Sequence, residues 1–146
     1  MERGRRIAFD VGAVRTGVAV CDPDGIFSSP VGNVTSIEEA LAEIAEYEPL
    51  TIYVGLPLNL RGEHTKSTEA AIYFARELSR QTVIPIRLID ERLTTKTASA
   101  MLRTAGKNAR TSKAVVDAAA ASLILEQAIA IEKAGSKAGV ALEELE

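Results

Sequence analysis

The hydrophobic and polar positions in the first third of the chain follow the short, alternating pattern that predicts β-strands. Apolar runs occupy residues 5–11, 17–22 and 26–34, and turns rich in Gly, Pro and Asp separate them. Because the connections are short, we expect these strands to be antiparallel neighbours in one sheet. The chain therefore opens with a three-stranded antiparallel unit.

Helices and two further strands follow. The apolar pattern predicts helices over about residues 36–48, 65–80, 94–103 and 113–133. A continuous apolar run at 51–55 predicts a buried strand, and residues 85–91 are predicted to form a fifth strand. Because helices connect them, these two strands are expected to be parallel to the first strand. The predicted fold class is α/β, with a mixed five-stranded sheet of three antiparallel strands and then two parallel strands, flanked by helices. This order of elements resembles the ribonuclease H-like fold.

The length and composition fit one folded domain. Of 146 residues, 47% are hydrophobic and 25% are charged, which are ordinary proportions for a globular protein. We expect residues 1–133 to form this domain and residues 134–146 to form a flexible C-terminal tail. No apolar stretch is long enough to cross a membrane and the chain begins with charged residues, so we expect a cytoplasmic location. The single cysteine, Cys21, is predicted to be a small core residue, and no cluster of His and Cys suggests zinc.

The distribution of charge differs from its total. The net charge is -3, which argues weakly against a nucleic-acid partner. Residues 92–116, however, contain no acid and six basic residues, which are Arg92, Lys96, Arg103, Lys107, Arg110 and Lys113. Such a local excess can attract phosphates because screening hides distant acids, although a solvated loop and helix face would explain it equally well.

Three carboxylates stand where solvation alone would not place them. Asp10 lies on the first strand, on the face that it shares with Ala8. Asp90 and Glu91 end the last predicted strand on opposite faces, so only one of them can join Asp10. Asp117 lies one turn into the most apolar helix. A buried carboxylate is costly unless it is neutralised, hydrogen-bonded or bound to a metal.

A cluster of Asp10, Glu91 and Asp117 would require a cation to offset the mutual repulsion of its charges. All-oxygen ligation favours Mg²⁺ or Mn²⁺, and two such ions can promote phosphodiester cleavage. Other roles remain open at this point. Asp10 could accept hydrogen bonds from the next turn, and Glu91 could pair with Arg92 or Lys96. Asp117 could simply be an acid in the first turns of a helix, where the helix dipole stabilises a negative charge.

Four sequence blocks, taken in order and spacing, resemble the YqgF/RuvX family of Holliday-junction resolvase-like nucleases, also described as pre-16S ribosomal RNA nucleases. These blocks are residues 10–19 (DVGAVRTGVA), 54–62 (VGLPLNLRG), 90–95 (DERLTT) and 117–121 (DAAAA). The resemblance runs from about residue 5 to 132. One departure is Val11, where the family often has proline.

The resemblance implies a ribonuclease H-like, metal-dependent nuclease that acts on structured RNA or branched DNA and matures small-subunit ribosomal RNA. It implies that Asp10, Glu91 and Asp117 are the catalytic and metal-binding acids, with Mg²⁺ or Mn²⁺ as the cofactor. We expect Asp90 to be structural. The implied partners are a pre-rRNA or branched DNA, and with them a ribosome precursor, bound by a monomer or a homodimer.

The other motif residues are expected to contact nucleic acid or shape its path. Gly12 and Gly17 would let the backbone turn tightly and let a phosphate approach. Arg15 and Arg92 are candidate phosphate clamps, although Arg92 could instead pair with Asp90.

Further along the chain, Lys96 at a helix start, together with Arg103, Lys107 and Arg110, would bind backbone phosphates. Asn59 would border the cleft that binds the nucleic acid. Three Phe, three Tyr and no Trp offer little base stacking, so we expect recognition through backbone and shape.

Two other classes of protein compete with the nuclease. The Asp-x-Gly-x-x-x-x-Gly pattern also resembles the phosphate loop of actin-like ATPases, but these need a second lobe for which the chain is too short. A non-catalytic module that keeps the fold and binds RNA, a ribosome precursor or a transcription protein is the main alternative. The three acids argue against that module.

Overall fold

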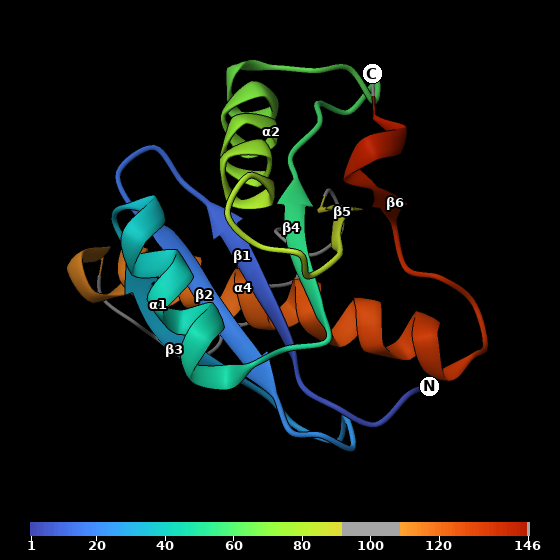
Figure 1. The fold of residues 1–146 in the computed structure, drawn as a ribbon. Helices are drawn as coiled ribbons and strands as arrows, with labels where there is room; N and C mark the ends of the chain where they lie inside the picture. Colours follow the sequence, from blue (N-terminus) through green and yellow to red (C-terminus); the bar gives the residue numbers. More distant parts are fainter. Residues whose placement is uncertain (92–108, 146) are drawn as a thin grey trace.

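The computed structural model describes residues 1–91 and 109–145, and it describes side chains for residues 1–91 and 118–145. One mixed sheet has the strand order β3-β2-β1-β4-β5-β6 (Figure 1). Its strands are β1 (Arg6–Val11), β2 (Thr16–Cys21), β3 (Ser28–Val34), β4 (Thr51–Leu56), β5 (Ile86–Asp90) and β6 (Val140–Ala141). The helices are α1 (Ile37–Tyr47), α2 (Lys66–Ser79), α4 (Ala109–Lys133) and the short 3₁₀ helix η1 (Leu142–Glu144).

The strand directions agree with the sequence pattern. β1 pairs antiparallel with β2, and β2 with β3, while β4 is parallel to both β1 and β5. Parallel strands end at the same edge of a sheet, so the ends of β1, β4 and β5 lie together. We call this edge the C-terminal edge, and the edge where these three strands begin the N-terminal edge.

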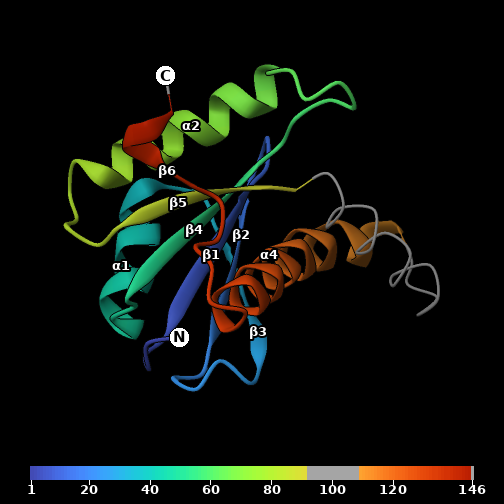
Figure 2. The ribbon, with the colours of Figure 1, turned by 90° about the vertical axis from the view of Figure 1, so that its right-hand side faces the viewer.

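Helices cover both faces of the sheet (Figure 2). One face packs against α1 and α2, and its core includes Phe9, whose ring meets Phe74 at 5.3 Å in an edge-to-face arrangement. The other face packs against α4, where Ala8 and Tyr53 contact the apolar residues of that helix. Along β1 these two faces alternate, which is the period-2 pattern of the sequence. In residues 1–91 and 109–145, no helix has the length and hydropathy needed to cross a membrane.

The C-terminal segment corrects two expectations. Within the described residues the sheet has six strands rather than five, and the segment 134–146, expected to be a flexible tail, contributes β6 and η1 from its described part, 134–145, with Leu142 buried. Arg87 on β5 donates hydrogen bonds to the carbonyls of Ala138 at 2.5 Å and Gly139 at 2.8 Å. Gly139 has a φ of +64° and lies so close to the Leu88 carbonyl that a Cβ there would overlap it. The glycine at position 139 thus allows the C-terminal segment to pack closely against β5.

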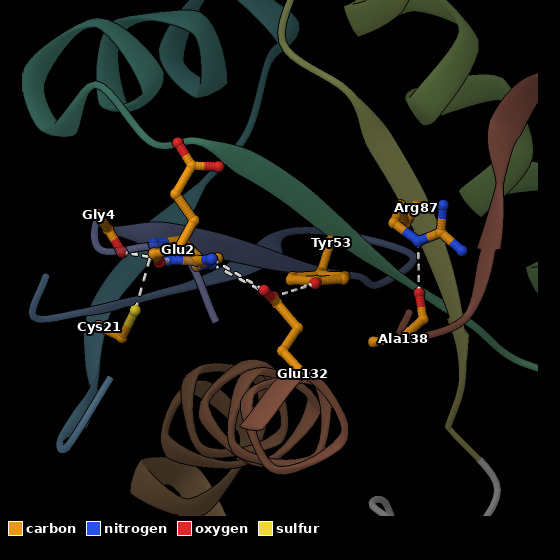
Figure 3. A network of polar contacts seen from close by, with 8 residues as sticks. Glu2, Gly4, Cys21, Tyr53, Arg87, Glu132 and Ala138 are labelled. Carbon is orange, nitrogen blue, oxygen red and sulfur yellow. Dashed lines mark hydrogen bonds and ion pairs between the residues drawn. The ribbon is translucent and has the colours of Figure 1, made fainter. Parts of the chain in front are cut away.

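A network of polar side chains fixes α4 at the N-terminal edge (Figure 3). Arg6 is 2% exposed and forms an ion pair with Glu132, from its NH2 group to Oε1, at 2.8 Å. The Tyr53 hydroxyl donates to the other oxygen of Glu132. Arg6 Nε also donates to Glu132 at 3.2 Å, and Arg6 Nη1 donates to the carbonyls of Glu2 and Gly4. The buried charges are therefore paired and hydrogen-bonded, as a stable buried ion pair requires.

Cys21 adjoins this network and is a buried, free cysteine. Its Sγ accepts a hydrogen bond from the Arg6 backbone N–H at 3.2 Å. Burial raises the pKa of the thiol, which disfavours the thiolate that a nucleophile requires. Its position fits the predicted role of a core residue.

Candidate active site

Two of the three predicted acids lie together at the C-terminal edge, on the face covered by α4. Asp10 lies two residues after Ala8 on β1. Glu91 directly follows the end of β5 and lies two residues after Ile89. Ala8 and Ile89 both belong to the core against α4, so the alternation of the strands directs Asp10 and Glu91 to that face. A hydrogen bond joins the Asp10 and Glu91 side chains.

Gly55 on the strand between them makes room for this contact. A Cβ at position 55 would overlap Oε2 of Glu91 and would lie 2.7 Å from Cδ1 of Ile124 on α4. Oε2 itself is fully buried. The carboxylate of Glu91 therefore occupies the space that a side chain from β4 would fill. A glycine within a strand commonly marks such a close approach, and that signal identifies Gly55, to which the sequence analysis gave no role.

The electrostatics of the pair oppose full ionisation. Burial raises the pKa of Glu91 well above its ordinary value, and the negative charge of Asp10, their shared hydrogen bond and the charge of Asp90 raise it further. Two carboxylates in one partly buried place retain a proton or attract a cation. The donor set is all oxygen, which suits Mg²⁺ or Mn²⁺ better than a softer metal.

Asp90 lies on the opposite face from Glu91. It pairs in register with Leu56 of β4, and it alternates with Leu88, which belongs to the core against α1 and α2. The two consecutive acids are thus directed to different sides of the sheet. The position of Asp90 is compatible with the structural role expected from its sequence.

Position 117 lies on the part of α4 for which the structure describes only the backbone. Among the described side chains, no group of three His, Cys, Asp or Glu residues could hold a metal ion. The described part of the predicted cluster is the pair of Asp10 and Glu91.

The turn between β1 and β2 is closed by a hydrogen bond from the Gly12 N–H to the Arg15 carbonyl at 2.9 Å. Neither Gly12 nor Gly17 has a positive φ, so this turn does not use the left-handed conformations that glycine permits. Gly17 pairs directly with Asp10 across the ladder. Arg15 is partly exposed on this turn, at the same edge of the sheet as Asp10.

Most of the predicted basic contacts lie outside the described residues. Arg92, Lys96, Arg103 and Lys107 belong to residues 92–108, and the backbone of Arg110 belongs to α4. Asn59 is described, and it lies in the segment that joins the end of β4 to α2.

The fold resembles solved structures of RuvC from Thermus thermophilus. The structure titled "T. thermophilus RuvC in complex with Holliday junction substrate" matches with a TM-score of 0.60 at 15% identity, covering 92% of this chain and 98% of that chain. A second structure of Thermus thermophilus RuvC matches with a TM-score of 0.57 at 13% identity, covering 90% and 97%. At this identity the likeness shows the fold alone, and it confirms the ribonuclease H-like α/β class.

Sequence comparison adds the family. The family model RuvX, "Holliday junction resolvase", matches residues 4–131. A Streptomyces avermitilis protein named "Putative pre-16S rRNA nuclease" is 43% identical over 145 residues, covering 94% of this chain and 93% of the relative. A Rhodococcus erythropolis protein of the same name is 45% identical over 157 residues, covering 97% and 89%. The chain belongs to the RuvX family.

Proposed function

We propose that this protein is a nuclease that hydrolyses phosphodiester bonds in structured nucleic acid, with pre-16S rRNA as its substrate in the cytoplasm. The observation that carries the proposal is the hydrogen-bonded pair of Asp10 and Glu91 at the C-terminal edge of the sheet. Ligand sites in sheets with parallel strands favour this edge. Relatives named as pre-16S rRNA nucleases, similar over nearly the whole chain, favour the ribosomal precursor over a DNA junction.

Asp10 and Glu91 would hold a divalent ion, with Asp117 as the third ligand. The raised pKa of Glu91 supports this assignment because burial and the charge of Asp10 oppose its ionisation, and a divalent ion would offset that repulsion. When bound, Mg²⁺ or Mn²⁺ would activate water for attack and stabilise the leaving oxygen.

The residues of the chain would position the substrate and manage one proton. Because its pKa is raised, Glu91 would hold a proton when no cation is present, and that proton would have to leave before both carboxylates could act as ligands. Arg15 on the β1–β2 turn would bind a phosphate next to the scissile bond. The basic residues Arg92, Lys96, Arg103, Lys107 and Arg110 would neutralise the flanking backbone.

Cleavage assays on three substrates test this function. Wild-type protein is incubated with a pre-16S rRNA fragment, a four-way DNA junction and a plain duplex, with and without Mg²⁺ or Mn²⁺. We expect metal-dependent cleavage of the precursor, and we expect Asp10→Asn to lower it by at least about a hundredfold, because a metal ligand is worth several kcal/mol to the transition state.

Glu126→Gln is the matched control, since Glu126 is an exposed acid on α4. It should cleave like the wild type. Metal-independent cleavage, or full activity of Asp10→Asn in clean preparations, would refute the proposed mechanism. Cleavage of the four-way junction alone would replace rRNA with branched DNA as the substrate.

A further inference from the structure

Residues 57–65, which join β4 to α2, form a loop that is held rigid by its own hydrogen bonds. Asn59 accepts hydrogen bonds at Oδ1 from the N–H groups of Arg61 and Glu63, both at 2.9 Å, and donates from Nδ2 to the Glu63 carboxylate at 3.0 Å. Its N–H donates to the Glu63 carbonyl at 3.1 Å, and its carbonyl accepts from Gly62 at 2.9 Å. Gly62 takes a φ of +78°, which this tight turn requires.

The base of the loop is also fixed. Leu58 and His64 form an antiparallel bridge across it. The Thr68 hydroxyl, buried in the first turn of α2, donates to the Pro57 carbonyl. The backbone of the tip is therefore held in place on the sheet and α2 before any partner binds.

The tip presents an apolar side chain that the fold does not use. Leu60 is 95% exposed, and the neighbouring Arg61 side chain is exposed as well. A rigid loop that holds a leucine in water gains nothing from it in folding, whereas burial in a partner would be favourable. Isolated exposed apolar residues are common, so position is the deciding observation.

That position is the edge of the sheet that carries Asp10 and Glu91. The loop follows the end of β4, and β4 lies between β1 and β5, the strands that lead to these two acids. Figure 2 shows the loop projecting on the same side as the end of β5 and the first turns of α4. A nucleic acid bound at the acids would pass within reach of the tip.

We propose that residues 59–62 form a finger that inserts Leu60 against an exposed base pair at a helix end or branch, while Arg61 binds the adjacent phosphate. Apolar side chains act as wedges at base steps in this way, and arginine is suited to phosphate. The finger rests on the proposed nuclease function and gives it a substrate class: nucleic acid in which a helix is interrupted near the scissile bond. A continuous duplex offers Leu60 no open base step.

Binding measurements separate the finger from the chemistry. An Asp10→Asn background prevents cleavage, and the probe is an RNA helix with a branch, carrying 2-aminopurine at the branch point, compared with a continuous duplex of equal length. We expect Leu60→Ala to weaken branch binding about tenfold and to abolish the rise in 2-aminopurine fluorescence, with duplex binding unchanged. Leu60→Met should preserve both signals. Arg61→Ala should weaken binding to both probes and lower the salt slope by about one.

Val83→Ala is the matched control because Val83 is 100% exposed and lies at the N-terminal edge, before β5. It should leave every signal unchanged. Equal branch affinity and fluorescence for Leu60→Ala and Val83→Ala would overturn the finger, as would a wild-type complex without any fluorescence rise. Leu60-dependent binding by a wild-type protein that cleaves nothing would instead overturn the proposed nuclease and leave the finger standing.

Discussion

The two edges of the sheet treat a buried carboxylate in opposite ways. At the N-terminal edge, Glu132 of α4 meets the buried guanidinium of Arg6 at 2.8 Å and accepts the Tyr53 hydroxyl. At the C-terminal edge, Glu91 contacts another acid, Asp10, and its carboxylate lies where a side chain at position 55 would be if Gly55 had one. Both carboxylates lie on the face that α4 covers. The first arrangement joins a carboxylate to a cationic side chain, while the second brings two acids together.

This difference separates stability from function. A buried ion pair with its hydrogen bonds satisfied holds the structure together, and breaking it is costly. Two acids in one partly buried place are unfavourable in the isolated protein, and such pairs cluster at functional sites. Substitutions at the N-terminal edge should therefore affect folding, and those at the C-terminal edge should affect metal binding and cleavage.

The largest expected effect on stability comes from Glu132→Ala. This change leaves the buried Arg6 charge and the Tyr53 hydroxyl without their shared acceptor, so we expect a loss of about 3–5 kcal/mol in the free energy of unfolding. Urea denaturation followed by circular dichroism measures it, with Glu126→Ala on the exposed side of α4 as the control. The protein that remains folded at low temperature should still cleave. A stability loss no larger than that of the control would show that the ion pair at the N-terminal edge does not stabilise the fold.

Glu91→Gln should change how stability depends on pH. The pKa of Glu91 is raised in the folded protein, so the folded state binds the proton more tightly than the unfolded state, where the pKa is about 4.3. The stabilisation is present below that unfolded pKa and is lost as pH rises toward the folded pKa, by up to about 1.4 kcal/mol per pH unit. Without metal, the free energy of unfolding of Glu91→Gln should therefore rise relative to that of the wild type as the pH increases from 6 to 8.

Melting temperatures measured across this range test the effect. Added Mg²⁺ or Mn²⁺ should raise the melting temperature of the wild type and have little effect on the variant. Parallel pH curves for the two proteins, or equal stabilisation of both by the metal, would contradict the assignment of Glu91.

Gly55→Ala should give the smallest change in stability. The added methyl group would overlap the Glu91 carboxylate and approach Ile124, so we expect a cost of about 1–3 kcal/mol from overpacking. Because Glu91 must move, cleavage should fall by about tenfold or more even at temperatures where the variant is folded. Comparison of cleavage rates and urea curves with those of wild type checks both effects. Unchanged cleavage would mean that the position of Glu91 does not matter.

Much of the fold and part of the site follow from local pattern. The period-2 alternation on β1 and β5 assigns Asp10 to one face and separates Asp90 from Glu91, because side-chain direction is a property of a single strand. The same holds for the helices, whose apolar spacing is visible in short windows. The acids could therefore be proposed as a group before any coordinates were known.

Features that depend on distant segments could not be predicted in this way. Strand β6 has only two residues, and it forms because Arg87 and Gly139, which lie 52 positions apart, fit together. The pairing of Arg6 with Glu132 spans 126 positions and leaves no periodic pattern in the sequence. Neither partner looks unusual by itself in its own segment.

The length of α4 couples the two edges mechanically. Ile124 and Glu132 are separated by just over two helical turns, at about 100° per residue, so they lie within about 80° of one another around the axis. The ion pair of Glu132 thus helps to fix the rotation of α4 about its axis, including the turn of Ile124, which meets Glu91 above Gly55. A single inserted residue between Ala121 and Ala128 would rotate one end by about 100° relative to the other. Changes in the length of this helix would be tolerated only when compensated to near-whole turns.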